Sequence, residues 1–317
     1  MKKCNIVFMG TPDIAVSMLD RILEDGYQVI AVVTQPDKKA GRKQDLKMPE
    51  VKLRALQEHI PVYQPIKIKD AMEELMKLDI DLFVTCAYGQ FIPSALLAYP
   101  TYGSINVHAS LLPKLRGGAP IHKAIMYGEK QTGMSIMRMV KAMDAGAVMA
   151  QCKVDILDTD TTGDLYDRLA KAGADLLSES IPKLLDDSAI FVEQCEEAAT
   201  FAYTISKDEE YIDFSKPLQE VYDHIRSLIP FPVGYAVING KKLKFHKVRK
   251  LEDKQVHELG KIHGIMQNAL AVACNGGYIL LDEVQLEGKS KTDAKSFYNG
   301  AGRVFIGQYF ELKKVNE

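Results

Sequence analysis

An asparagine and a histidine stand two residues apart in a stretch that favours a β-strand. Asn106 and His108 lie in the run SINVH, which leads into a loop bounded by proline and glycine. Because side chains alternate along a strand, both would project from the same face. A carboxamide that holds an oxyanion and an imidazole that donates or moves a proton suit acyl transfer to an amine. An isolated Asn-x-His pair is more often a structural pair, so other motifs must decide its meaning.

Two further segments could complete such a site. Asp144 lies in the motif MDAG just after an expected strand, where its carboxylate could reach His108. The loop AYGQFIP at 87–93 follows another expected strand and offers backbone groups and apolar walls to a flat ligand. Both also have ordinary interpretations, since Asp144 could cap a turn and Tyr88-Gly89 could end a strand.

The composition is that of a globular protein. The chain has 317 residues, of which 47% are hydrophobic and 26% charged, enough for one large or two medium domains. Its five cysteines are scattered singly with no spacing that suits a metal, so we expect reduced cysteines, no metal and a cytoplasmic location. The sequence holds no apolar run of about 18 residues, which excludes a membrane-spanning helix.

Charge is distributed unevenly despite a formal net charge of −2. Residues 37–54 hold seven basic and three acidic residues, and residues 241–254 hold seven basic and two acidic ones. Residues 155–197 hold twelve acidic and three basic residues. Such segregation indicates a positive surface for a polyanion, because phosphate contacts depend on local charge. Solvated loops and hairpins would explain the charge pattern equally well.

Apolar strand-like runs alternate with amphipathic helical patterns in the first part of the chain. The expected strands are 3–9, 28–34, 81–87, 104–108, 134–140 and 148–156, and the expected helices are 13–24, 49–58, 70–78, 119–127 and 162–185. This order predicts an α/β fold, a Rossmann-like, mostly parallel sheet with helices on both faces. Ligands of such folds bind beyond the carboxyl ends of the strands, where His108 would lie.

The pattern changes after residue 190. Residues 215–229 form one amphipathic pattern stopped by prolines, and short strands follow, joined at Asn239-Gly240 and at 275–277. We therefore predict a smaller OB-like β-barrel C-terminal domain. The expected division is 1–190 for a catalytic domain, 191–207 for a linker and 208–317 for the second domain.

The first strand ends in GTPD, not in a G-x-G-x-x-G fingerprint, and no Walker A motif is present. The missing glycines deny a pyrophosphate its close approach to the backbone, which argues against a dinucleotide cofactor.

An ordered series of motifs extends over nearly the whole chain. They are QPD with AGR, AYG, NVH, SLLP, RGGAPI and DAG, followed by ISK, IDFSKP, PFPVG and EG. With these motifs the chain resembles the methionyl-tRNA formyltransferase family. The resemblance implies formyl transfer from 10-formyltetrahydrofolate to the amino group of methionyl initiator tRNA during translation initiation. It also implies folate and tRNA as partners, and we expect a monomer. The chain departs from the family pattern at Ala109, where glycine is expected, and at Phe231, where tryptophan is expected.

The resemblance assigns roles to particular residues. The catalytic residues would be Asn106, His108 and Asp144, and the folate site would include Ser110, Leu111, Leu112, Pro113, Tyr88, Gly89 and Ile92. The tRNA-entering loop corresponds to residues 35–49, and together with the second basic segment it gives the expected tRNA-binding residues Arg42, Lys38, Lys43, Lys241, Lys242 and Lys244.

Three alternatives remain open at this point. A folate-dependent formyltransferase acting on a small amine or a sugar nucleotide would share the catalytic residues without needing the basic segments. A formyltetrahydrofolate hydrolase module would use water as the acceptor, although the chain lacks the long dehydrogenase extension of that family. A noncatalytic RNA-binding protein would keep the basic segments and leave Asn106, His108 and Asp144 unexplained.

Overall fold

The computed structural model describes residues 4–40, 45–255 and 258–311, and it separates into two compact units. Unit 1 comprises Met1–Pro120, Gln131–Asp155 and Tyr166–Tyr203, and unit 2 comprises Ile121–Lys130, Ile156–Leu165 and Thr204–Glu317. Two short segments that precede residue 166 in the sequence therefore belong to unit 2. The assignment of a catalytic domain to residues 1–190 and of a second domain to residues 208–317 remains a prediction.

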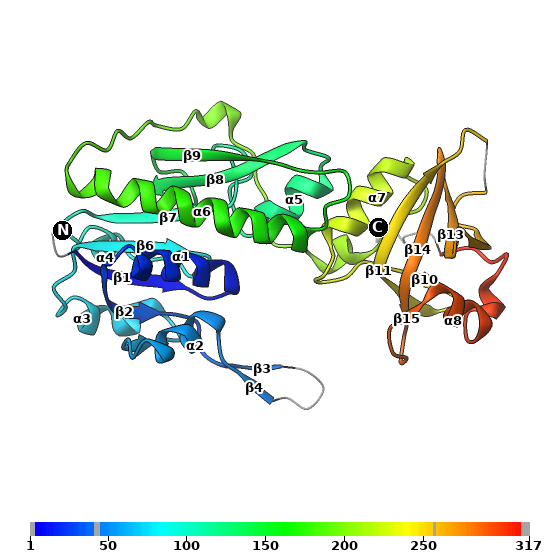
Figure 1. The fold of residues 1–317 in the computed structure, drawn as a ribbon, viewed down its shortest axis with the longest axis horizontal. Helices are drawn as coiled ribbons and strands as arrows, with labels where there is room; N and C mark the ends of the chain where they lie inside the picture. The colour runs from blue at the N-terminus through cyan, green and yellow to red at the C-terminus, as the bar shows by residue number, and fades with distance from the viewer. Residues whose placement is uncertain (1–3, 41–44, 256–257, 312–317) are drawn as a thin grey trace. The chain divides into compact units, whose positions relative to one another are not determined.

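Unit 1 is built on a seven-stranded sheet with the order β5-β2-β1-β6-β7-β8-β9 (Figure 1). The strands are β1 (Asn5–Gly10), β2 (Gln28–Val33), β5 (Val62–Tyr63), β6 (Leu82–Cys86), β7 (Ser104–His108), β8 (Gln131–Arg138) and β9 (Val148–Asp155). Pairing is parallel from β5 to β7 and antiparallel at β8 and β9. The predicted mostly parallel, Rossmann-like sheet is confirmed.

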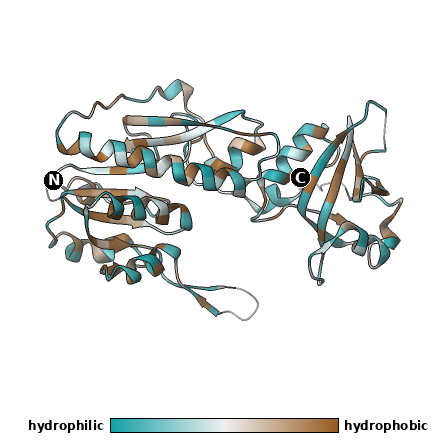
Figure 2. Ribbon diagram, in the orientation of Figure 1, coloured by the Kyte–Doolittle hydropathy of each residue, from teal (hydrophilic) through white to brown (hydrophobic). Residues whose placement is uncertain are grey.

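Helices cover this sheet because their apolar residues recur on one side. The helical elements of unit 1 are α1 (Asp13–Glu24), α2 (Glu50–Gln57), η1 (Ile68–Ala71), α3 (Met72–Leu75), α4 (Ser94–Leu97), most of α6 (Thr162–Leu185) and η2 (Glu196–Ala198). Alternation along β1 sends Val7 and Met9 into a core shared with Leu75 and Leu96. Figure 2 shows the apolar residues concentrated in the inner strands.

One local prediction needs correction, one is confirmed, and one element was not predicted. Residues 70–78 are not one helix, because a 3₁₀ turn at Ile68–Ala71 precedes a single turn of α3. The helix predicted at 162–185 is confirmed, and it continues through Pro182 to Leu185. A small hairpin of β3 (Lys38–Ala40) and β4 (Asp45–Lys47) was missed, since its charged residues give no apolar alternation.

Unit 2 contains an antiparallel sheet with the order β10-β11-β14-β13-β12, with β15 beside β14. Its strands are β10 (Tyr235–Ile238), β11 (Lys241–Glu252), β12 (Ile262–Met266), β13 (Ala269–Cys274), β14 (Gly277–Leu286) and β15 (Thr292–Asp293). The helical elements are α5 (Pro120–Met126), η3 (Lys207–Glu210), α7 (Leu218–Ser227), α8 (Ala294–Asn299) and η4 (Arg303–Phe305). Both predicted hairpin turns are present, and at the first one Asn239 and Gly240 adopt φ of 48° and 71°.

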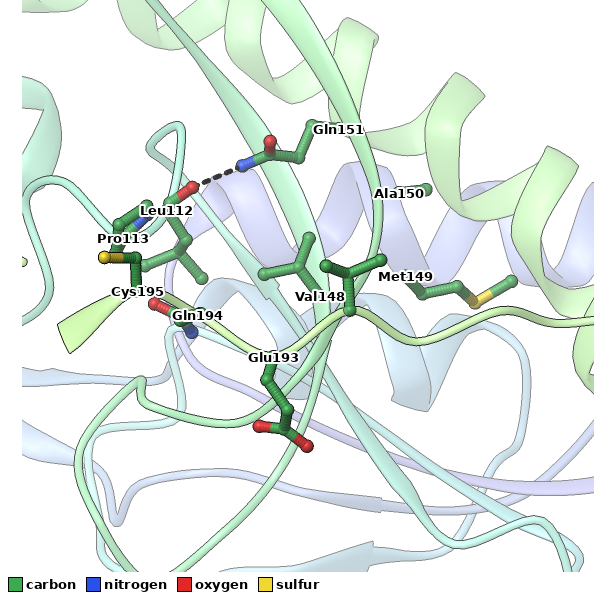
Figure 3. Close-up of a pocket in the computed structure, with 10 residues that line it drawn as sticks. Leu112, Pro113, Val148, Met149, Ala150, Gln151, Glu193, Gln194 and Cys195 are labelled. Carbon is green, nitrogen blue, oxygen red and sulfur yellow. Dashed lines mark hydrogen bonds between the residues drawn. The ribbon is translucent and has the colours of Figure 1, made fainter. Parts of the chain in front are cut away.

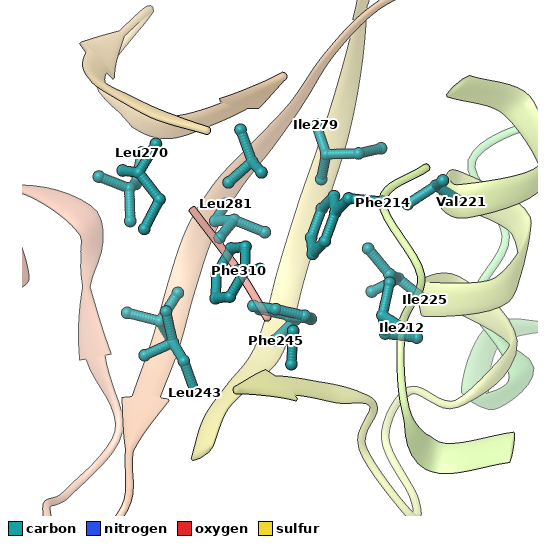
Figure 4. Close-up of a cluster of buried hydrophobic side chains, with 14 of the residues drawn as sticks. Ile212, Phe214, Val221, Ile225, Leu243, Phe245, Leu270, Ile279, Leu281 and Phe310 are labelled. Atoms are coloured by element: carbon teal, nitrogen blue, oxygen red, sulfur yellow. The ribbon is translucent and has the colours of Figure 1, made fainter. Parts of the chain in front are cut away.

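The core of unit 2 lies between the curved sheet and α7. Ile225 of α7 and Phe214 pack with Phe245 of β11 and with Phe310, and the rings of Phe214 and Phe310 are stacked 4.9 Å apart (Figure 4). This cluster is fully apolar, so burial of these side chains provides the main stabilisation of the unit.

The last described residues connect the two ends of this sheet. Ile262 donates its backbone N–H to Gln308, and Phe310 donates to Gly260, both at the β12 end. Glu311 donates to Val237 of β10 at the other end, at 2.8 Å. This segment satisfies backbone groups of both edge strands, which completes the barrel-like sheet that the sequence predicted.

Among the helices that the structure describes, none has both the length and the apolar character needed to cross a bilayer.

Candidate active site

Strand β7 places Asn106 and His108 on the same face near the carboxyl end of the parallel strands. Asn106 pairs with Thr85 of β6, and the buried Thr85 hydroxyl donates to Asn106 Oδ1 at 2.8 Å. In this arrangement the amide oxygen faces Thr85, which leaves Nδ2 as the donor of the Asn106 amide. No hydrogen bond to Asn106 Nδ2 is found within the described residues, so this group is available to a ligand.

The His108 ring is buried, with 6% of the residue exposed, and both its nitrogens face oxygen atoms. Nε2 lies 3.1 Å from the carbonyl oxygen of Leu115, and Nδ1 lies 3.7 Å from Oδ2 of Asp144. Because a carbonyl only accepts, Nε2 carries a proton in this arrangement. Nδ1 is therefore the nitrogen through which His108 and Asp144 can exchange or share a proton.

Asp144 lies in the loop between β8 and β9, and its backbone adopts φ of 50°, a left-handed conformation that aspartate tolerates. Its Oδ2 accepts the backbone N–H of Gly117 at 2.8 Å. A side chain at Gly117, whose φ is 122°, would meet the carbonyl oxygen of Ala202 at 2.8 Å. The glycine therefore permits the close approach that holds the carboxylate. The structure thus brings Asp144 to His108, which the sequence predicted.

Gln194 contacts the turn at Asp144 directly, and Arg116 contacts Gln194. The sequence analysis predicted neither role. Gln194 Nε2 donates to the carbonyl oxygens of Asp144 at 2.8 Å and Gly146 at 2.7 Å. Its Oε1 accepts from the buried Arg116 guanidinium, which also pairs with Glu196. The hydrogen bonds from Arg116 hold the pKa of the Glu196 carboxyl below its usual value. Gln194 is 50 residues from Asp144, so no local pattern could have shown this contact.

The loop after His108 holds its shape through its own hydrogen bonds. Ser110 Oγ donates to the carbonyl oxygen of Lys114, and Ser135 Oγ donates to the carbonyl oxygen of Ser110, both at 2.6 Å. Leu112 N–H in turn donates to Ser135 Oγ at 3.2 Å. Ser110 is buried, so its hydroxyl stabilises the loop in this structure and does not face a cavity.

A cavity of about 360 Å³ opens beside this loop. Figure 3 shows the residues that line it. Leu112 and Pro113 form one wall, and Gln151, whose Nε2 donates to the Leu112 carbonyl at 2.9 Å, contributes from β9. The other lining residues are Val148, Met149, Ala150, Val192, Glu193, Gln194 and Cys195. The lining is mostly apolar with a few amides and one carboxylate, which suits an organic ligand better than a bare ion.

Tyr88 and Ile92 lie in the turn after β6, where the sequence predicted apolar walls for a ligand. Both side chains pack into the core of unit 1, and burial raises the pKa of the Tyr88 hydroxyl to about 12. The Tyr88 carbonyl accepts from Thr11 Oγ1 at 3.2 Å and Gln35 Nε2 at 3.0 Å. Gly89 adopts φ of 86°, which glycine permits in this tight turn, and the residue is exposed.

The predicted tRNA-binding residues fall in both units. Lys38 is exposed on β3, whereas Arg42 and Lys43 lie outside the described residues. Lys241, Lys242 and Lys244 belong to β11 of unit 2, and Lys241 and Lys242 are exposed. Lys242 Nζ lies 4.3 Å from the centre of the Tyr235 ring. Over the described ranges, no group of three or more His, Cys, Asp or Glu side chains could hold a metal ion.

Two family models match the chain. The formyl transferase model covers residues 3–181, and the formyl transferase C-terminal domain model covers residues 204–302. Methionyl-tRNA formyltransferase of Bacillus licheniformis is 47% identical over 94% of this chain and 95% of its own length. The enzyme of that name from a Geobacillus species is 48% identical over 94% of each chain.

The chain belongs to the methionyl-tRNA formyltransferase family. It is therefore a transferase, as the sequence indicated. Among solved structures, an N-formyltransferase from Helicobacter canadensis in complex with folinic acid and dTDP-3-aminofucose is similar, with a TM-score of 0.67 and 20% identity. It covers 91% of this chain and 100% of that one. HypX from Aquifex aeolicus in complex with tetrahydrofolic acid has a TM-score of 0.68 and 13% identity, covering 96% of this chain and 48% of that one. At these identities the two structures support the fold alone.

Proposed function

We propose that this chain transfers a formyl group from 10-formyltetrahydrofolate to the α-amino group of methionyl initiator tRNA, for translation initiation. The observation that carries the proposal is that Asp144 of the β8–β9 loop meets His108 beside Asn106 near the carboxyl end of β7, in a chain of this family. The relatives at 47–48% identity favour this acceptor over a sugar nucleotide or another small amine.

The proposed reaction needs an oxyanion donor and a route for one proton. The neutral α-amine attacks the formyl carbon, a new C–N bond forms, and the carbonyl oxygen becomes an oxyanion. The bond from this carbon to folate N10 then breaks, while the proton lost by the amine is returned to N10. Preorganised donors that face the oxyanion lower the barrier, because the negative charge that they stabilise develops only as the reaction proceeds.

Asn106 is the donor that needs no rearrangement. Thr85 holds its Oδ1, so Nδ2 can point at the formyl oxygen as soon as folate binds. His108 can donate from Nε2 only after it exchanges the Leu115 carbonyl for the substrate oxygen. Asp144 faces Nδ1 at 3.7 Å, where it orients the ring, stabilises its cationic form and relays a proton, directly or through water.

We assign the folate site to the loops around these residues. The backbone of Tyr88 and Gly89, with Ile92, would contact the pterin, and Ser110, Leu111, Leu112 and Pro113 would form the adjoining wall. The hydrogen bonds from Thr11 and Gln35 to the Tyr88 carbonyl hold this turn in place, which supports a preformed position for the neighbouring backbone of Gly89. Because Ser110 Oγ and the Tyr88 ring are buried, we assign these two residues backbone roles.

The basic residues would bind the tRNA. We propose that Lys38, Arg42 and Lys43 in the 35–49 loop position the acceptor end, with Arg42 as the main contact. Lys241, Lys242 and Lys244 on β11 would contact phosphates, which gives residues 208–317 an RNA-binding role and residues 1–190 a catalytic one. The supporting observation is exposure, since Lys38, Lys241 and Lys242 extend into solvent. We further propose a cytoplasmic monomer, the form in which charged tRNA could reach the site without a second subunit.

A formylation assay with a panel of acceptors tests this function. The full-length chain is incubated with 10-formyltetrahydrofolate and with charged initiator tRNA, uncharged initiator tRNA, free methionine or an amino-sugar nucleotide. We expect formylation of the charged tRNA only, because the reacting amine and the phosphate contacts must be present together. Formylation of the sugar nucleotide in preference to the tRNA would contradict the proposal, and so would release of formate without transfer.

A further inference from the structure

We propose that Gln194 is a positioning residue, which ties the turn that carries Asp144 to the buried guanidinium of Arg116. The inference extends the proposed function, because it rests on the role given there to Asp144. Gln194 touches none of the proposed reacting atoms. Its effect on the reaction would therefore pass through the placement of the Asp144 carboxylate.

The Gln194 side chain uses its full hydrogen-bonding capacity in this contact. Nε2 donates one hydrogen to the Asp144 carbonyl at 2.8 Å and the other to the Gly146 carbonyl at 2.7 Å. Oε1 accepts from Arg116 Nε at 3.1 Å and from Nη2 at 2.9 Å. The orientation of the amide is unambiguous, because carbonyls cannot donate and a guanidinium cannot accept.

Arg116 is a rigid anchor for this arrangement. Its side chain is only 3% exposed, and its guanidinium also makes two bonds to the Glu196 carboxylate, at 2.9 and 2.8 Å. Its backbone donates to Thr200 at 2.9 Å and accepts from Ala202 at 2.7 Å. A buried charge held from both the side chain and the backbone has little freedom to move.

The residues on either side of Arg116 contact the other two members of the arrangement. The Leu115 carbonyl accepts from His108, and the Gly117 N–H donates to the Asp144 carboxylate. Gln194 therefore closes a ring that runs from Arg116 through Gly117 to Asp144 and back, and His108 contacts this segment through Leu115. Without its amide, the carbonyls of Asp144 and Gly146 would each lose a hydrogen bond, and the Gly117 N–H alone would tie the carboxylate to this segment.

Two substitutions separate the two halves of the Gln194 contact. Gln194→Glu keeps acceptors for Arg116 but removes both hydrogens that bind the turn. Gln194→Met has similar length and removes the donor and the acceptor together. Glu197→Gln is the matched control, because this exposed side chain lies in the same segment and is not among the residues that line the cavity.

If the amide hydrogens position Asp144, Gln194→Glu and Gln194→Met both lower kcat about 10- to 100-fold, the range expected for a misplacement near the reacting atoms. The KM for charged tRNA stays close to that of the unsubstituted chain, and Glu197→Gln keeps its activity. An unchanged kcat for Gln194→Glu overturns the proposal, since it would show that only the Arg116 contact matters.

A double-mutant cycle with Asp144→Ala distinguishes positioning from a general structural role. If Gln194 acts through Asp144, Gln194→Met lowers single-turnover rates less than about twofold further in the Asp144→Ala background. A multiplicative further loss in that background overturns the positioning role. The Asp144→Ala variant is measured first, before any Gln194 variant. A normal rate for Asp144→Ala alone contradicts the proposed function of Asp144.

Discussion

Nδ1 of His108 and Oδ2 of Asp144 lie 3.7 Å apart. The distance exceeds that of a hydrogen bond, while Gly117 already binds the same oxygen at 2.8 Å. Catalytic contacts often tighten only when substrate binds. We therefore expect the distance between His108 Nδ1 and Asp144 Oδ2 to shorten when substrate binds. At the same time the N–H at His108 Nε2 would stop donating to the Leu115 carbonyl and donate to the formyl oxygen instead.

The Thr85 hydroxyl offers a direct test of how Asn106 is oriented. Thr85→Val keeps the shape of the side chain and removes the bond to Asn106 Oδ1. One such bond contributes about 1 kcal/mol, so we expect kcat to fall about fivefold with KM for folate little changed. Thr132→Val is the control, because its buried hydroxyl has no partner within the described residues. Equal activities for the two variants would show that Thr85 does not position Asn106.

The lysines of β11 can be tested through the salt dependence of tRNA binding. Each phosphate contact releases counterions, so affinity should fall steeply with salt, and Lys241→Ala or Lys242→Ala should each reduce the slope of log K against log salt by about 1. Lys77→Ala, an exposed lysine of unit 1 outside both basic segments, should leave the slope unchanged. Slopes that match for all three variants would remove β11 from the tRNA-binding surface.

Asp37 supplies a pH-dependent contact at the start of the β3–β4 hairpin. Hydrogen bonds from Gln64 and Lys52 lower the pKa of Asp37 from its usual 3.8. The ionised form is thus favoured in the folded chain, and the resulting stability is fully present above the unfolded pKa and lost as pH falls through the folded one. The Tm difference between the unsubstituted chain and Asp37→Asn should be constant above about pH 5 and shrink toward zero in stronger acid. A difference that grows in acid would contradict this assignment.

The cysteines should differ sharply in reactivity. Cys4, Cys86 and Cys274 are buried, and burial raises the pKa of each thiol to about 12. Cys195 is exposed beside Gln194 at the rim of the cavity. A maleimide should label Cys195 fastest and slow formyl transfer, whereas Cys195→Ser should remain active and resist inhibition. Rapid labelling of the Cys195→Ser variant, measured by mass, would contradict this order.

Strand alternation was sufficient to predict the shared face of Asn106 and His108, because β7 is regular and buried on both sides. The positions of the main helices followed equally well from their apolar spacing. The predicted start of α7 was three residues too early, because the helix begins at Leu218, directly after Pro217.

The contacts that orient these catalytic candidates could not be predicted from local sequence. Thr85, Gln194 and Gly117 are 21, 50 and 27 residues away from the groups they bind. Their partners are decided by how loops fold over the sheet edge, which no periodicity encodes. The charged β3–β4 hairpin and the sheet closure at 308–311 were missed for related reasons, since neither has an apolar pattern that repeats every second residue.

The central claim is that Asn106, His108 and Asp144 act together on one formyl group, and single-turnover formylation of charged initiator tRNA tests it most directly. Asn106→Ala, His108→Ala and Asp144→Ala should each slow transfer at least about a hundredfold while the Tm and tRNA binding stay unchanged. Transfer at a near-normal rate by any of these variants, with the fold intact, would contradict the role assigned to that residue.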